Sequence, residues 1–254
     1  MYRGFNLNLD GWDFDGNEGL ISEGGKILEK NKAVVRKNLE LLKNASGELV
    51  ASSVISEWFP SVKADIFISH SHRDAPIVNM LAGWLSEEMG LSSFIDSSLW
   101  GFAPDLLKII DNEFCYYPEK KIYDYNERNL STSHVYMMLS TSIAKMINNC
   151  EVVIFVNTPN SISTKEYIKG RGATASPWIY SEIALASLIQ RKTPEEHRTE
   201  GSVKVEASLE SLKVKYDLDM THLTELSTDD LLNWSAKIQQ KGTASLDALY
   251  SLKA

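Results

Sequence analysis

The sequence predicts an α/β protein built around a parallel β-sheet. Three short apolar runs are spaced along the chain, and amphipathic helical patterns separate them. The runs cover residues 64–69, 93–96 and 151–157. Strands that alternate with helices form parallel sheets, and helices cover both faces of such sheets. Ligands bind beyond the carboxyl ends of the strands, so the loops after Ser69, Asp96 and Asn157 are the predicted walls of a site.

Helices are predicted wherever apolar residues recur at helical spacing. These helices cover residues 22–43, 53–58, 74–89, a segment that starts near 104, 131–149, 178–191 and 228–240. Gly90 suits the C-terminus of one helix, and Pro104 suits the first turn of another. Irregular structure is predicted for residues 1–22, for an insertion near 115–130, and for loops at 158–176 and 193–202. Weaker strand candidates lie at 203–206 and 213–216.

This pattern divides the chain into two parts. Residues 1–61 form a predicted N-terminal extension that is partly helical, and residues 62–254 form the predicted α/β domain. Leu28, Val35 and Leu42 give the extension an apolar stripe. The stripe fits an autoinhibitory or oligomerising role as well as a purely structural cover.

The composition is typical of a globular protein and argues against some classes of binding partner. Hydrophobic residues make up 43% of the 254 residues and charged residues 24%. The 26 basic and 34 acidic side chains give a formal net charge of -8, which argues against a general binder of nucleic acid or of anionic membranes. Cys115 and Cys150 lack metal-site spacing, which favours free thiols in a reducing cytoplasm. No apolar signal segment is found, and runs such as 152–156 are too short to cross a bilayer.

Three segments follow one another in a specific order and spacing. They are Asp65-Ile66-Phe67-Ile68-Ser69-His70-Ser71 with Arg73-Asp74, then Phe94-Ile95-Asp96 with the loop to Gly101, and then Val152-Val153-Ile154-Phe155-Val156 followed by Ser176, Trp178 and Glu182. Together they resemble a TIR (Toll/interleukin-1 receptor) domain, and residues 216–234 are similar to the last strand and helix of bacterial TIR proteins. The resemblance covers residues 62–241 and implies a flavodoxin-like fold with a central parallel sheet of about five strands. It leaves residues 1–61 and 115–130 unexplained.

The resemblance implies an enzyme. Many bacterial TIR proteins cleave NAD⁺ at the nicotinamide–ribose bond, and they release nicotinamide with ADP-ribose or a cyclic ADP-ribose isomer. A glutamate on the helix after the third strand is essential in that group; Glu182 matches it, and Trp178 matches the aromatic residue before it. The chain is similar to the TIR proteins of Thoeris antiphage defence. This similarity implies a nucleotide signal, a separate effector protein that receives the signal, and a homo-oligomer formed through TIR–TIR contacts. NAD⁺ is the expected substrate, and no cofactor is expected.

Glu182 also suits this chemistry on physical grounds. The nicotinamide ring of NAD⁺ is already cationic, so it leaves as a neutral molecule and needs no general acid, unlike the leaving group of ordinary glycosidases. One carboxylate beside C1′ can stabilise an oxocarbenium-like transition state or orient the ribose hydroxyls. We therefore predict that Glu182 is catalytic and ionised. The alternative is an exposed glutamate that only favours the helix dipole.

The predicted substrate-binding residues lie in the loops after the three strands and at the start of the Trp178 helix. They are Ser69, His70, Ser71, Arg73, Asp74, Asp96, Ser97, Trp100, Asn157 and Trp178. The turn at 69–74 offers backbone N–H groups to phosphates, although Ser71 and Asp74 could simply cap the helix. Trp100 could stack on adenine or contact a neighbouring subunit, and Trp178 could line the site or pack in the core. His70 and His72 lack a third ligand, so no metal site is predicted.

Two other functions fit the sequence. A TIR module without catalytic activity would signal by self-association. An enzyme related to nucleoside deoxyribosyltransferases would cleave a different N-glycosidic bond. A dinucleotide-binding fingerprint, Gly170-x-Gly172-x-x-Ala175, is rejected because it follows a polar loop rather than a strand.

Overall fold

A five-stranded parallel sheet forms the centre of the molecule. The computed structural model describes residues 1–9, 17–33, 43, 49–97, 102–162, 172–174, 176–198, 216–218 and 220–253. The strands lie in the order β3-β2-β6-β1-β9, and each neighbouring pair is parallel. They are β1 (Arg3–Asn8), β2 (Ile66–Ser69), β3 (Ser93–Ile95), β6 (Val152–Asn157) and β9 (Thr224–Leu226). The predicted α/β class is confirmed, and the arrangement is consistent with a flavodoxin-like fold.

Helices connect these strands and cover the sheet. They are α1 (Glu18–Ala33), α2 (Ala51–Trp58), α3 (Ala75–Glu87) after the 3-10 turn η2 (His72–Asp74), α5 (Ala103–Ile110), α6 (Tyr125–Asn149), α7 (Pro177–Leu188), α8 (Pro194–Arg198), α9 (Thr228–Lys237) and α10 (Ala244–Leu252). Most predicted helices are present, although α1 starts earlier than predicted and the end of the predicted helix 22–43 lies outside the described residues. Within the part of the chain that the structure describes, no helix has both the length and the apolar character needed to cross a membrane.

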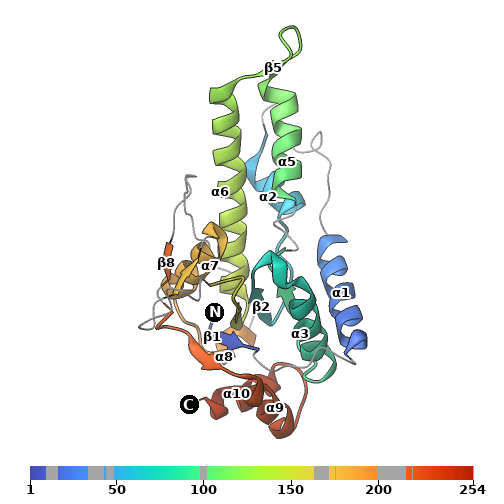
Figure 1. Cartoon of the computed structure of the whole chain (residues 1–254), viewed down its shortest axis with the longest axis vertical. Coiled ribbons are helices and arrows are strands. Elements are labelled where there is room, and N and C mark those ends of the chain that lie inside the picture. The colour runs from blue at the N-terminus through green and yellow to red at the C-terminus, as the bar shows by residue number, and fades with distance from the viewer. Residues whose placement is uncertain are drawn as a thin grey trace.

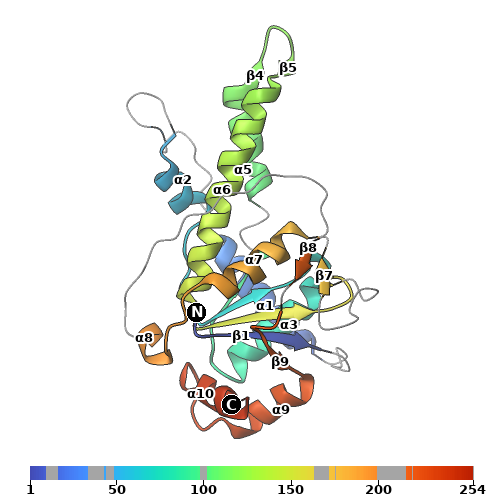
Figure 2. The same ribbon diagram turned by 90° about the vertical axis from the view of Figure 1, so that its left-hand side faces the viewer.

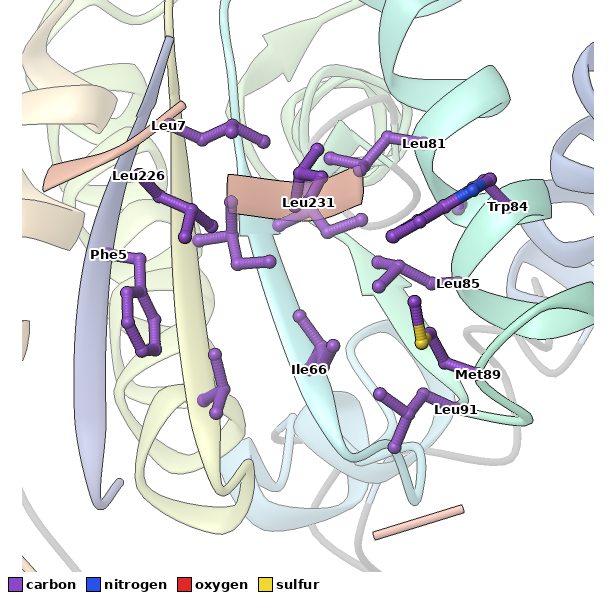
Figure 3. Close-up of a cluster of buried hydrophobic side chains, with 14 of the residues drawn as sticks. Phe5, Leu7, Ile66, Leu81, Trp84, Leu85, Met89, Leu91, Leu226 and Leu231 are labelled. Atoms are coloured by element: carbon purple, nitrogen blue, oxygen red, sulfur yellow. The ribbon is translucent and has the colours of Figure 1, made fainter. Parts of the chain in front are cut away.

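Alternate residues of β2 face two different hydrophobic cores. Ile66 and Ile68 of β2 face the core under α3, α9 and α10, where the rings of Trp84 and Trp234 meet edge to face at 5.9 Å. Figure 3 shows part of this core. Phe67 faces the opposite core, which α2, α5, α6 and α7 cover. Because β2 is buried on both faces, it reads in the sequence as a continuous apolar run.

Strand β1 is the largest departure from the sequence prediction, which assigned irregular structure to residues 1–22. β1 pairs with β6 on one side and with β9 on the other, so it is an inner strand of the sheet. Phe5 and Leu7 fill one core, while Asn6 donates its side-chain amide to the Glu225 carboxylate at 2.8 Å. The prediction for β1 is wrong because asparagines interrupt its apolar pattern and its pairing partners lie far away in the sequence. Residues 1–61 therefore supply a sheet strand as well as helices.

A helical hairpin projects from the sheet (Figures 1 and 2). Helix α5 continues into a π-helical turn, η3 (Asp111–Cys115), and two short antiparallel strands, β4 (Tyr116–Tyr117) and β5 (Ile122–Tyr123), lead to α6. Asp124 caps α6 by accepting hydrogen bonds from two backbone N–H groups of the first turn. The predicted insertion near 115–130 is thus the tip of this hairpin, and α6 begins earlier than the predicted residue 131.

The C-terminal part of the chain also departs from the prediction. Strands β7 (Gly172–Thr174) and β8 (Tyr216–Leu218) form a separate antiparallel pair, so β9 rather than β8 is the last strand of the central sheet. Helix α8 lies in a segment predicted as a loop, and α10 was not predicted. Helix α10 is held by a hydrogen bond from Trp234 Nε1 to the carbonyl of Ser245 at 2.7 Å. The strand candidate at 203–206 lies outside the described residues.

Gly24 on α1 and Gly83 on α3 allow these two helices to lie close together. A Cβ on Gly24 would lie 1.8 Å from the carbonyl oxygen of Asn79, whereas a Cβ on Gly25 would meet nothing within 4 Å.

We expect Gly24→Ala to lower the free energy of unfolding by about 2 kcal/mol, because backbone must move. Gly25→Ala should raise it by up to about 1 kcal/mol through helix propensity. Urea unfolding followed by circular dichroism measures both, and equal effects would contradict the close crossing.

Candidate active site

The connections between strands reverse direction between β2 and β6. The chain leaves β2 for β3 toward one edge of the sheet, and it leaves β6 for β9 toward the opposite edge. The place where the connections diverge in this way is called the switch point of the sheet. In open α/β sheets, ligands bind there, at the carboxyl ends of the strands. Ser69 ends β2 and Asn157 ends β6. The predicted site residues after these strands therefore lie at the position where this kind of fold binds ligands.

Glu182 is buried at this position. It lies on α7, whose start is fixed by Ser176, which accepts a hydrogen bond from Ile179 N at 3.3 Å. Glu182 is only 1% exposed. Its Oε2 accepts a hydrogen bond from Ser69 Oγ at 2.5 Å. The alternative of an exposed helix glutamate is therefore wrong. The contact joins the end of β2 to α7 across 113 residues of sequence.

Asp96 and His70 form a second polar contact from the loops after β3 and β2. Nδ1 of His70 lies 2.5 Å from Oδ1 of Asp96. The same carboxylate accepts hydrogen bonds from the backbone N–H groups of Ser97 at 2.5 Å and His70 at 3.4 Å. Both side chains are almost fully buried. The loops after two neighbouring strands are thus held together by one carboxylate.

Burial and charge set the protonation of this cluster. Burial raises the pKa of Glu182 well above its ordinary value, the nearby Asp96 carboxyl raises it further, and the Ser69 hydrogen bond opposes the rise. For His70, burial lowers the pKa, but the negative charges of Asp96 and Asp74 outweigh burial, so the pKa is raised. The environment therefore shifts both Glu182 and His70 toward their protonated forms, whereas the sequence analysis expected an ionised Glu182.

Three buried polar atoms of this cluster make no hydrogen bond of good geometry among the described residues. They are Oε1 of Glu182 and both ring nitrogens of His70. The close Nδ1 contact of His70 is an ion pair by distance, although its N–H is not aligned for a hydrogen bond. Buried polar groups are nearly always satisfied by protein or by ordered water. Oε1 of Glu182 and Nε2 of His70 are therefore the atoms of the cluster whose hydrogen bonding a water or a ligand would complete.

Asp74 has a positioning role in the loop after β6. Its Oδ2 accepts a hydrogen bond from Thr158 Oγ1 and its Oδ1 accepts one from Asn160 Nδ2, both at 2.6 Å. Asp74 precedes α3, but its side chain makes no capping hydrogen bond. Sequence reasoning did not single out Thr158 and Asn160. The sequence did contain a signal for these two residues. Thr158 and Asn160 follow one predicted strand, Asp74 follows another, and parallel strands end at the same edge of the sheet.

The other predicted site residues lie around this cluster or outside it. Trp178 is half-buried on α7, with its ring centroid 5.4 Å from that of Tyr136 on α6, so it packs between two helices. Asn157 is half-buried at the end of β6, and Arg73 is exposed. Ser71 precedes η2 without a capping hydrogen bond from its side chain. Trp100 lies outside the described residues.

No group of three metal-ligating side chains occurs among the residues that the structure describes. Comparison with known proteins gives no match. No family model matches the chain, and no curated protein or solved structure matches it. The TIR resemblance thus stays a prediction that rests on the sequence motifs. The functional argument has to come from the Glu182 cluster.

The raised pKa of Glu182 makes a prediction about stability. Between the ordinary value of 4.5 and the raised value, the folded protein binds more protons than the unfolded chain, so the carboxyl lowers stability as pH rises. Glu182→Gln removes this loss. We expect the free energy of unfolding of Glu182→Gln, relative to that of the wild type, to rise by up to about 1.4 kcal/mol for each pH unit above pH 4.5.

Urea unfolding at a series of pH values between 5 and 8 measures this gain. Glu88→Gln, which changes an exposed glutamate just after α3, is the matched control and should follow the wild type. A wild-type stability that falls no faster with pH than that of Glu182→Gln would contradict the raised pKa.

Proposed function

We propose that this chain is an NAD⁺ glycohydrolase or ADP-ribosyl cyclase that uses Glu182. The observation that supports the proposal is the position of Glu182: a buried carboxyl group at the switch point of the sheet, with one oxygen held by Ser69 and the other unpartnered. A ribose at this position could offer its hydroxyls to the free oxygen. The TIR resemblance of the surrounding motifs points to the same substrate.

The reaction needs only one carboxylate from the protein. The C1′–N bond breaks, its electron pair returns to the pyridinium ring, and nicotinamide leaves uncharged. The remaining ribosyl cation is stabilised by an ionised Glu182 and is then attacked by water, which gives ADP-ribose, or by a nucleophile of the same molecule, which gives a cyclic isomer. The positive nicotinamide ring would favour loss of the Glu182 proton on binding, because an opposite charge nearby lowers the pKa of a carboxyl group.

The raised pKa of Glu182 also favours a second candidate. A nucleoside base, unlike nicotinamide in NAD⁺, leaves with negative charge unless it is protonated, so its departure benefits from a general acid. A carboxyl group that keeps its proton beside Asp96 can supply one. Cleavage of the N-glycosidic bond of a deoxynucleoside, as in nucleoside deoxyribosyltransferases, is therefore the alternative function.

We expect purified protein at high concentration to consume NAD⁺ and release nicotinamide. Glu182→Gln should slow this reaction by about 100-fold or more, because it removes the charge that stabilises the transition state. Liquid chromatography of the products measures the rate and separates ADP-ribose from cyclic isomers. Glu88→Gln is the control and should retain full activity. Equal rates for the wild type and Glu182→Gln would refute the catalytic assignment.

The pH dependence distinguishes the two candidates. If ionised Glu182 cleaves NAD⁺, kcat/KM should rise with pH, by up to tenfold per unit, until the raised pKa is passed. If protonated Glu182 cleaves a deoxynucleoside, kcat/KM should fall over the same range. Parallel assays with NAD⁺ and with 2′-deoxyinosine from pH 5 to pH 9 measure both slopes. Turnover of only the deoxynucleoside would reject the NAD⁺ proposal.

The proposal includes the setting that the resemblance implies. We infer a cytoplasmic enzyme of antiphage defence that assembles as a homo-oligomer through TIR–TIR contacts and passes its nucleotide product to a separate effector protein. A TIR module without activity, which signals by self-association alone, would instead leave NAD⁺ intact under every condition of assembly.

A further inference from the structure

The helical hairpin contains a cavity of about 340 Å³ that shares no residue with the Glu182 cluster. Its walls come from α2, from the junction of α5 with η3, and from α6. The apolar lining residues are Leu49, Ala51, Val54, Ile110, Phe114, Cys115, Leu130 and Met138, and the polar ones are Glu127, Ser131 and His134. Sites for small organic molecules typically measure about 300–1,000 Å³ and have mostly apolar linings with a few polar groups. The cavity meets both criteria.

Several polar groups at the cavity wall satisfy one another's hydrogen bonds. Cys115 Sγ and Ser131 Oγ both donate to Oδ1 of Asp111, and Arg128 Nε donates to Oδ2 of the same carboxylate at 2.8 Å. The Asp111 carboxylate, the Cys115 thiol and the Ser131 hydroxyl are therefore satisfied without a ligand, and most of the other lining residues are apolar. Phe114 and Leu130 at its walls are about half exposed, at 47% and 54%. An apolar body inside the cavity would remove part of this surface from water.

One carboxylate, that of Glu127, is among the residues that line the cavity. Two cations close to it already have partners: Arg128 is paired with Asp111, and Lys43 is paired with Glu113. Glu127 lines the cavity, and its carboxylate has no ion pair within the described part of the chain. An anionic ligand would be repelled there, and a cationic group would be attracted.

We propose that this cavity binds an organic amine. Its aryl or alkyl body fills the apolar interior between α2 and α6, and its ammonium group lies at the exposed Glu127 carboxylate. The proposal stands independently of the reaction proposed for Glu182.

Three compounds with one body test the proposal on the full chain. They are 3-phenylpropylamine, 3-phenylpropan-1-ol and 3-phenylpropanoate, titrated by ligand-observed NMR at low salt and pH 8, where a histidine side chain is ordinarily uncharged. We expect the amine to bind saturably with a Kd on the order of 1 mM, as suits a ligand of this size. The alcohol should bind about two- to fivefold more weakly, because the ion pair is exposed, and the acid should bind most weakly. Absence of saturable binding, or equal affinity for acid and amine, would overturn the proposal.

Matched variants locate the ligand. Ala51 is an exposed lining residue at the start of α2, so Ala51→Trp should fill the entrance and weaken binding of both amine and alcohol by at least about tenfold. Ser52→Trp, one residue further along the same exposed turn, does not line the cavity and should bind like the wild type. Unchanged binding by Ala51→Trp would place the ligand elsewhere and overturn the proposal.

The charge contribution is tested separately. Glu127→Gln should reduce the affinity for the amine to that for the alcohol and leave the alcohol unchanged. Glu119→Gln, at the exposed tip of the hairpin, is the control and should change neither. This comparison does not depend on filling the cavity, so it decides the proposal even if Ala51→Trp fails to fold. An amine preference that survives in Glu127→Gln would refute the assigned role of Glu127.

Discussion

The pairing of β1 between β6 and β9 is the constraint on which the sheet depends. β9 contacts the sheet through β1, and β6 would be an edge strand without it. The fit is close: a Cβ on Gly4 would lie 2.6 Å from Cδ2 of Leu223, just ahead of β9. The connection after β6 passes β1 to reach β9 at the far edge of the sheet. The switch point itself lies between β2 and β6, because the connections to β3 and to β9 run toward opposite edges.

The cluster at the switch point is held by polar contacts that lower stability as well as order the site. A carboxyl group buried like that of Glu182 loses the solvation of its charged form, and one hydrogen bond from Ser69 compensates only in part. The Asp96–His70 contact adds a second pair of buried titratable groups at the same place. Enzyme active sites commonly contain buried groups with shifted pKa values that lower the stability of the fold but can act as acids or bases. This is the physical reason to place function at Glu182.

Helix α6 connects the two functional regions that the structure suggests. It is 25 residues long. Its first half forms the hairpin with α5 and lines the cavity with Ser131, His134 and Met138. Tyr136 on the same helix packs against Trp178, in the first turn of α7 and one turn before Glu182. Trp178, which the sequence placed one helical turn before Glu182, thus forms a contact between α6 and α7.

The sequence by itself determined the elements whose signal is local. Strands buried on both faces, such as β2 and β6, appear as apolar runs, and α3 and α7 show helical periodicity with recognisable ends. It also placed Glu182, Ser69, His70 and Asp96 at one edge of the sheet, because parallel strands end together. Only the tertiary structure decided the place of β1, the docking of α10, and the burial of Glu182 that raises its pKa. Strand pairing and pKa values depend on neighbours that are distant in sequence, and no local pattern records which residues those neighbours are.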